Sequence, residues 1–207
     1  MISVHMVPVP RGKVVAYRDD GPLSRGMGML VAGQLPPLPP LAAAAFVTGI
    51  LLLMGMAGAG GLAVFAPLVT LLLAGPGSSH PHDGRYDWMA PPVLRAIEYS
   101  FIAACGFAYD VPPLLIFLVL GAAAFHHYDL VYRMRQRVYP PPWLAALGLG
   151  WEGRMLVLGL FALVGWVTGG FALLAAYLWG AFGWESLTCW LAAPRTGARA
   201  ADAGAQD

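Results

Sequence analysis

Residues suited to acid–base chemistry follow an apolar stretch at Phe125–Val138, which reads FHHYDLVYRMRQRV. On a helix, His126, Asp129 and Arg133 are spaced i, i+3 and i+7, so they form one stripe with Tyr132 beside it. One interpretation is a helix that leaves a membrane, where polar residues are expected on all sides. The other is one wall of a site that binds a phosphate or a metal ion, because acid and base alternate at the predicted membrane boundary.

A second polar pair, Arg95 and Glu98, lies near the start of another apolar helix. The three-residue spacing places both side chains on one face. A charge at the middle of a membrane helix costs about 2.5–3.5 kcal/mol, and an inward-facing pair offsets that cost. Two interpretations are open: an ion pair that locks two helices together, or a site that binds substrate.

The loop SSHPHDGRYDW, residues 78–88, holds a third group. His80 and His82 supply imidazoles, and Asp83 and Asp87 supply carboxylates. A metal site needs more ligands than His80–Asp83 offers, so Asp87 or a residue of the His126 stripe would have to complete it. The sequence favours a polar turn over a metal site, because Asp-Gly is a common turn dipeptide.

These groups define the predicted functional residues and their roles. The predicted catalytic residues are Asp83, Glu98, His126 and Asp129, and the predicted substrate-binding residues are Arg85, Arg95, Tyr132 and Arg133. A divalent metal ion, held by His80, His82 and Asp87, is the cofactor considered. Two other acids have predicted structural partners: Glu152 caps a helix N-terminus, and Glu185 pairs with an arginine from another cluster.

The composition indicates that membrane helices position these residues. Of the 207 residues, 58% are hydrophobic and 11% are charged, whereas a soluble domain has roughly a quarter charged residues. The net charge of +1 gives no indication of nucleic-acid binding. We therefore predict an all-α integral membrane protein.

Six membrane spans, arranged as three hairpins, are predicted from the apolar stretches. Leu41–Ala74 is too long for one span of about 20 residues, and the AGAGG segment at residues 57–61 divides it. Single spans follow at about 92–107 and 112–127. Met155–Trp190 is again too long for one span, and we predict a break at Gly169–Gly170.

The distribution of cations indicates the orientation. With both termini in the cytoplasm, all twelve Lys and Arg residues lie on the cytoplasmic side, as the positive-inside rule requires. They are Arg11, Lys13, Arg18, Arg25, Arg85, Arg95, Arg133, Arg135, Arg137, Arg154, Arg195 and Arg199. The predicted location is the inner, or plasma, membrane of a bacterial cell.

The predicted organisation has three parts. Residues 1–36 form a cytoplasmic segment with an interfacial helix, residues 37–193 form the six-helix membrane domain, and residues 194–207 form a disordered tail.

Several motifs resemble a family of uncharacterised bacterial membrane domains. They are YRDDGPLSR (17–25), SSHPHDGRYDW (78–88), FHHYDLVYRMRQ (125–136), PPWLAALGLGWEGRMLVL (141–158) and WES (184–186). The resemblance covers most of residues 14–192. Members of that family are fused to CDP-alcohol phosphatidyltransferases or encoded beside them, which implies a partner of that kind.

A more distant likeness is to the CDP-alcohol phosphatidyltransferase fold, which has six spans and the motif D-x-x-D-G-x-x-A-R. Asp83-Gly84 lies where that motif begins, but residues 87–88 are Asp-Trp, and no paired aspartates follow. Asp20-Gly21-x-x-Ser24-Arg25 resembles part of the motif but precedes the first span. The two-metal mechanism of that fold is therefore not expected here.

Three functions remain in consideration. The first is a protein of phospholipid or polyprenyl-phosphate metabolism that binds an anionic headgroup at a cytoplasm-facing site and transfers phosphoryl groups or assists an enzyme that does. The second is a small transporter, which polar residues gathered on one side disfavour. The third is a scaffold that pairs with a phosphatidyltransferase or forms a homodimer. The expected partners are membrane lipids.

Overall fold

The computed structural model describes residues 16–57, 61–136 and 142–204. All regular elements in these ranges are helical, so the all-α prediction is confirmed there. The α-helices are α2 (Pro22–Leu30), α3 (Leu38–Met56), α4 (Ala66–Ala74), α5 (Ala90–Ala108), α6 (Pro113–Arg135), α7 (Pro142–Leu147), α8 (Gly150–Leu163) and α9 (Val167–Gly204). Short 3₁₀ helices are η1 (Leu62–Phe65), η2 (Gly75–Ser79) and η3 (Asp87–Met89).

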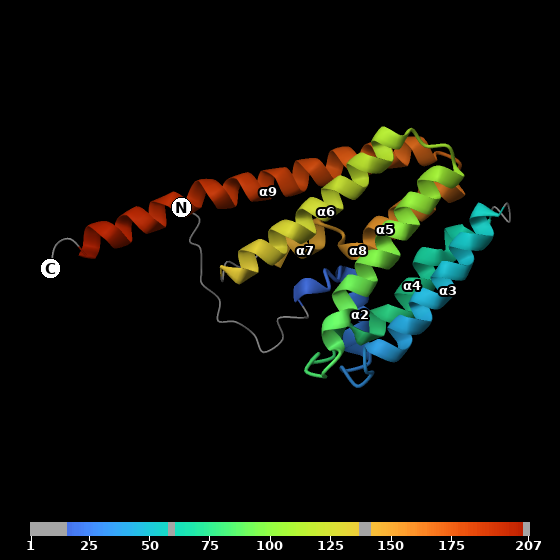
Figure 1. The fold of residues 1–207 in the computed structure, drawn as a ribbon, viewed down its shortest axis with the longest axis horizontal. Helices are drawn as coiled ribbons and strands as arrows, with labels where there is room; N and C mark the ends of the chain where they lie inside the picture. Colours follow the sequence, from blue (N-terminus) through green and yellow to red (C-terminus); the bar gives the residue numbers. More distant parts are fainter. Residues whose placement is uncertain (1–15, 58–60, 137–141, 205–207) are drawn as a thin grey trace.

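Proline sets where several helices begin. α3, α5 and α6 each carry proline in the first turn, where its missing N–H has no helical partner to lose. α3 ends at Met56, directly before the predicted break at residues 57–61, and the chain returns through η1 and α4. The long helices lie side by side, and α9 extends as an arm past the others (Figure 1).

The second predicted break lies at a different place. α8 ends at Leu163, the chain turns at Val164–Trp166, and Gly169–Gly170 lies inside α9. Gly165 adopts φ +72°, a left-handed conformation that glycine adopts without strain and that stops the helix. The prediction of a break at Gly169–Gly170 was therefore wrong by about one helical turn.

Among the described residues, four stretches are long and apolar enough to cross a membrane. They are Leu38–Met56, Leu62–Ser79, Pro113–Arg135 and Val167–Cys189. α5 and α8, the two further predicted spans, are also helical, but α8 has only 14 residues. A helix, α2, is present within the segment 1–36 where we predicted an interfacial helix, and its position at the membrane interface stays a prediction.

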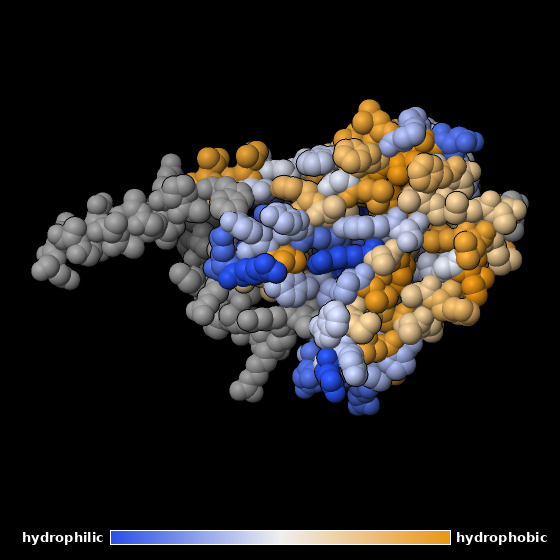
Figure 2. All heavy atoms as spheres, in the orientation of Figure 1, coloured by the Kyte–Doolittle hydropathy of each residue, from blue (hydrophilic) through white to orange (hydrophobic). Residues whose placement is uncertain are grey.

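The surface divides along the length of the helices. Hydrophobic atoms cover one half of the visible face, and hydrophilic atoms gather at the end where α5 begins and α6 finishes (Figure 2). Phe46, Leu53 and Phe117 are each about 70% exposed, as expected for side chains that contact lipid. Arg11, Lys13 and Arg137 lie outside the described residues. The predicted disordered tail, residues 194–207, overlaps the end of α9, which extends to Gly204.

Candidate functional site

The segment before α2 enters the polar end of the helix bundle and carries Asp19 to its centre. The Trp151 N–H donates to the Asp19 carbonyl at 3.2 Å. Gly21 and Gly150 pack backbone against backbone, because a Cβ atom on Gly150 would lie 2.2 Å from the Gly21 nitrogen. Two glycines therefore permit the close approach that fixes this segment on the start of α8.

Asp19 is the centre of a buried ionic cluster. Its carboxylate lies 3.2 Å from His126 Nε2, 3.1 Å from His127 Nε2 and 2.6 Å from Arg154 Nη2. Burial by itself raises the pKa of the Asp19 carboxyl. The positive charge of Arg154, together with His126 and His127, more than offsets burial and holds that pKa well below its usual range. Asp19 is therefore a carboxylate at neutral pH.

Arg154 joins Asp19 to a second carboxylate. Its Nε donates to Glu98 Oε1 at 2.5 Å, and its Nη1 donates to the Gly148 carbonyl at 2.9 Å. The side chains of Arg154 and Glu98 are completely buried. Glu98 Oε2 has no hydrogen-bond partner among the described residues. The interior thus holds two carboxylates on one guanidinium, with two imidazoles beside them.

The two imidazoles have different second partners. Both present Nε2 to Asp19, so a neutral ring donates from Nε2 and leaves Nδ1 as an acceptor. His127 Nδ1 accepts from the Tyr99 hydroxyl at 2.7 Å. His126 stacks on Phe182 with ring centres 4.2 Å apart. The second partner is therefore a hydroxyl for His127 and an aromatic ring for His126.

A neighbouring cluster surrounds Arg18. Arg18 binds the Asp20 carboxylate through two nitrogens at 2.7 and 3.2 Å, and it also donates to the Ala74 carbonyl at 3.1 Å. Its Nη1 lies 3.3 Å from His82 Nε2, and Trp151 Nε1 donates to Asp20 at 2.9 Å. Burial, and then the charge of Arg18, lower the pKa of His82, which keeps that ring neutral.

A third cluster joins α6 to α9. Arg133 donates to Asp129 one turn earlier and binds both carboxylate oxygens of Glu185 on α9. The prediction that Glu185 pairs with an arginine is confirmed. Asp129 and Arg133 thus contact each other, whereas His126 of the same predicted stripe contacts Asp19.

Glu152 caps a helix, as predicted, but the helix is α2 and not its own. Its two carboxylate oxygens accept from the backbone N–H groups of Gly21 at 3.0 Å and Ser24 at 3.1 Å. These N–H groups lie at the start of α2 and lack partners within that helix. A buried acid on α8 therefore holds the N-terminal helix in place.

Arg95 and Glu98 do not pair with each other. Glu98 binds Arg154, whereas Arg95 Nη2 donates to the Tyr17 carbonyl at 3.3 Å. Glu98 does form an ion pair between two helices, but its partner is Arg154 and not Arg95, because α8 brings a buried guanidinium against α5. Arg95 Nε is buried without a hydrogen-bond partner among the described residues.

Other predicted residues lie on the surface. Asp83 and Arg85 are exposed in the loop between η2 and η3, and the Arg85 guanidinium lies 5.4 Å from the centre of the Tyr86 ring. Tyr132 is 41% exposed, and its ring lies 6.3 Å from that of Tyr128. No contact described in the structure links Asp83 to His126 or Glu98.

The residues predicted to hold a metal are near one another without forming a ligand set. His80 Nδ1 lies 3.9 Å from Asp87 Oδ2, and that same oxygen accepts from the Gly84 N–H at 3.0 Å. His82 faces Arg18, a cation. Within the described ranges, no group of three or more His, Cys, Asp or Glu side chains is arranged to hold a metal ion.

Sequence reasoning missed Asp19, Arg154 and His127, three members of the central cluster. Asp19 and Asp20 precede α2, and no local spacing pattern distinguishes them from ordinary loop residues. One signal was available: an acid pair directly before an amphipathic helix, in a chain with few acids, marks a segment that has a cationic partner. Nothing in the sequence pairs residue 19 with residue 154.

Comparison with known families gives one match. A model described as a family of unknown function (DUF5941) matches residues 11–206, so the chain belongs to that family. No curated protein and no solved structure matches the chain.

Proposed function

We propose that this member of a family of unknown function is an integral membrane protein of phospholipid or polyprenyl-phosphate metabolism. It binds an anionic phosphate headgroup at the cytoplasmic end of the helix bundle. The observation that carries this proposal is Arg95, a half-buried cation without a carboxylate partner among the described residues.

Among the residues whose burial is described, the other half-buried or buried arginines are each paired with a carboxylate. Arg18 binds Asp20, Arg133 binds Asp129 and Glu185, and Arg154 binds Asp19 and Glu98. Arg95 has one described hydrogen bond, to a backbone carbonyl, and a buried Nε without a partner. A cation in a membrane helix is costly unless it meets an anion, and a guanidinium matches a phosphate in geometry and charge.

His126 supplies the proposed proton acceptor. The Asp19 carboxylate contacts Nε2 and orients the ring, as a carboxylate does for the imidazole of a general base. Glu98 belongs to the same buried cluster through Arg154. We assign Asp129 to holding Arg133 against α9, so its role in this proposal is structural.

The proposed topology keeps six crossings in three hairpins, with both termini in the cytoplasm of a bacterial cell. The helical stretches α3, η1–α4–η2, α5, α6, α8 and α9 support this count. The 14 residues of α8 extend about 21 Å, less than the roughly 30 Å of a hydrocarbon core. The polar cluster at its start therefore lies recessed below the headgroups, where a lipid phosphate meets it.

The second candidate is a companion of a CDP-alcohol phosphatidyltransferase. It is favoured by the lack, in the described part of the chain, of an acidic group arranged for a metal ion. A companion would present the headgroup to the enzyme and leave the chemistry to its partner.

A binding measurement tests the headgroup site. The purified protein in detergent is titrated with dihexanoyl phosphatidic acid and, in parallel, with dihexanoyl phosphatidylcholine, and binding is followed by native mass spectrometry. We expect the anionic lipid to bind at least tenfold more tightly. Arg95→Gln should lower the affinity for the anionic lipid about tenfold, which corresponds to about 1.4 kcal/mol of binding free energy. Arg135→Gln, an exposed arginine at the end of α6, is the matched control and should change affinity less than threefold. Equal affinity for both lipids would refute the proposal.

A turnover assay then separates the two candidates. The protein is reconstituted in vesicles, by itself or together with a phosphatidyltransferase, and turnover of labelled CDP-alcohols is measured in both cases. Turnover by the protein alone that is lost in His126→Gln, with headgroup affinity retained, supports catalysis. Headgroup binding without turnover supports the companion role.

A further inference from the structure

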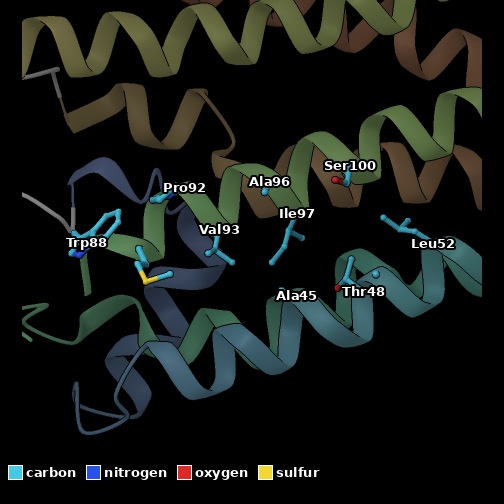
Figure 3. A pocket seen from close by; sticks show the side chains of 11 residues that line it. Ala45, Thr48, Leu52, Trp88, Pro92, Val93, Ala96, Ile97 and Ser100 are labelled. Carbon is cyan, nitrogen blue, oxygen red and sulfur yellow. The ribbon is translucent and has the colours of Figure 1, made fainter. Parts of the chain in front are cut away.

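A groove of about 380 Å³ runs along the membrane-facing surface between α3 and α5. Its walls include Ala45 and Gly49 of α3 and Val93, Ala96 and Ser100 of α5. Figure 3 shows Val93 and Ile97 extending from α5 toward α3, with Trp88 at one end of the groove and Leu52 and Ser100 at the other.

Small side chains create the groove. Ala45, Gly49 and Ala96 stand where larger residues would fill the space between the helices. A Cβ atom added to Gly49 would meet no other atom within 4 Å. The hollow is therefore encoded by residue size, and a single substitution can fill it.

The lining is suited to a hydrocarbon. Thr48, the polar residue on the α3 wall, directs its hydroxyl to Thr70 at 2.7 Å, and the Thr70 hydroxyl donates to the Ala66 carbonyl at 2.8 Å. The Thr48 hydroxyl is therefore engaged inside the protein, and its methyl group is left for the groove. An apolar groove on a membrane-facing surface takes an apolar chain, because polar groups there would lose their hydrogen bonds.

The length and the ends of the groove match one leaflet of a bilayer. From Met89 to Ser100 the helix rises about 16 Å, close to half of the roughly 30 Å hydrocarbon thickness. Trp88, 62% exposed, lies at the polar end, where tryptophan favours the headgroup layer. Arg85 precedes Trp88 by three residues, so positive charge flanks this end of the groove.

We propose that the α3–α5 groove holds one acyl chain of an anionic glycerophospholipid whose phosphate lies at the Trp88 end, near Arg85. This inference rests on the proposed binding of an anionic headgroup and adds the part of the ligand that lies inside the membrane. The groove fixes the lipid by its chain, and the positive charge at the Trp88 end selects it.

Photolabelling tests the groove directly. The protein is reconstituted in phosphatidylcholine vesicles that contain phosphatidylglycerol with a diazirine in one acyl chain. After illumination, labelled peptides are mapped by mass spectrometry. We expect labelling of peptides 45–52 and 93–100 to exceed that of α9 peptides around Gly180. Gly49→Phe should reduce groove labelling at least fivefold.

Gly180→Phe is the matched control. Gly180 is an exposed helical glycine at which an added Cβ atom also meets nothing within 4 Å. It should leave groove labelling unchanged, and the unfolding midpoints of both variants show that each has folded. Uniform labelling of all exposed helices, or labelling insensitive to Gly49→Phe, would overturn the inference.

Two further arms separate this inference from the proposed function. The same diazirine chain on phosphatidylcholine tests the headgroup: equal, Gly49→Phe-sensitive labelling by both lipids supports the acyl-chain groove and refutes anionic selectivity. Unlabelled polyprenyl phosphate is the second arm. Displacement of the probe at a tenfold lower concentration than unlabelled phosphatidylglycerol would overturn the acyl-chain assignment in favour of an isoprenoid.

Discussion

Two regions of the helix bundle, the polar end and the contact between α3 and α4, are held together by different interactions. At the polar end, buried charges from α5, α6, α8 and the segment before α2 meet at Asp19 and Arg154. Along α3 and α4, apolar side chains pack, and one hydroxyl pair, Thr48 and Thr70, joins the helices. The buried charges specify one geometry. Loss of one charged partner costs much of the unfolding free energy, because the other charge stays buried and unpaired. The α3–α4 contact tolerates substitution, because lipid and packing replace each other at similar energy.

Removing the central cation should produce the largest effect. Arg154→Met keeps most of the side-chain volume but leaves Asp19 and Glu98 buried without their ion-pair partner. We expect a loss of about 3–5 kcal/mol in unfolding free energy, the cost of breaking a buried pair. Unfolding by SDS in mixed micelles measures it. A loss below 1 kcal/mol would mean that water reaches these carboxylates.

The Glu152 cap gives the next largest effect. Glu152→Ala leaves the N–H groups of Gly21 and Ser24 without acceptors, at about 1–3 kcal/mol. Glu152→Gln retains one acceptor oxygen and should recover part of the loss. Limited proteolysis near α2 reports whether the helix detaches. If Glu152→Ala and Glu152→Gln were both as resistant to proteolysis near α2 as the wild type, the capping role would be contradicted.

A smaller effect should appear as pH falls. The neutral His82 ring accepts from Arg18 through Nε2 and donates through Nδ1 to the His80 carbonyl. The pKa of His82 is lowered in the fold by burial and then by Arg18, so the folded state takes up this proton less readily than the unfolded chain. Its stabilising contribution is complete above the unfolded value of about 6.5 and is lost as pH falls below it.

The matching measurement compares the wild type with His82→Gln between pH 8 and 5. The unfolding midpoint of the wild type should fall more steeply below pH 6.5 than that of the variant. Asp19 stays ionised over this range, because its pKa lies well below the usual value. Parallel curves for the two proteins would exclude His82 as the titrating group.

The smallest effect is expected at the contact between α3 and α4. Thr70→Val removes the hydroxyl between Thr48 and the Ala66 carbonyl and should cost about 0.6 kcal/mol, the average for such bonds between membrane helices. Thr48→Val removes only one of the two bonds and serves as the comparison. A loss of unfolding free energy equal to that of Arg154→Met would show that the polar end and the α3–α4 contact depend on polar interactions to the same degree.

Much of the architecture could be predicted from local patterns. The apolar stretches, the break at residues 57–61 and the prolines at the starts of α3, α5 and α6 place most helices. The turn before α9 was misplaced, because two adjacent glycines signal a break more strongly than Gly165 alone. A helix in lipid tolerates Gly169–Gly170, since its backbone has no water to bond to.

The site was less predictable, because its geometry depends on distant contacts. The sequence identifies His126, Glu98 and Glu185 as unusual polar residues in apolar helices. Their partners, Asp19, Arg154 and Arg133, follow from how the helices pack. Spacing rules relate neighbours on one helix, and for that reason they paired Arg95 with Glu98.

The glycine contact between Gly21 and Gly150 also bears on the order of biosynthesis. The segment before α2 leaves the ribosome before α8 does, and the part of α8 that it contacts is synthesised some 130 residues later. Asp19 must therefore stay hydrated at the membrane surface while the four helical stretches before α8 are inserted, and it enters the bundle only after Arg154 has been translated. Chains arrested before α8 should therefore carry an unprotected segment before α2, because the contacts of that segment with Glu152 and Arg154 cannot yet form.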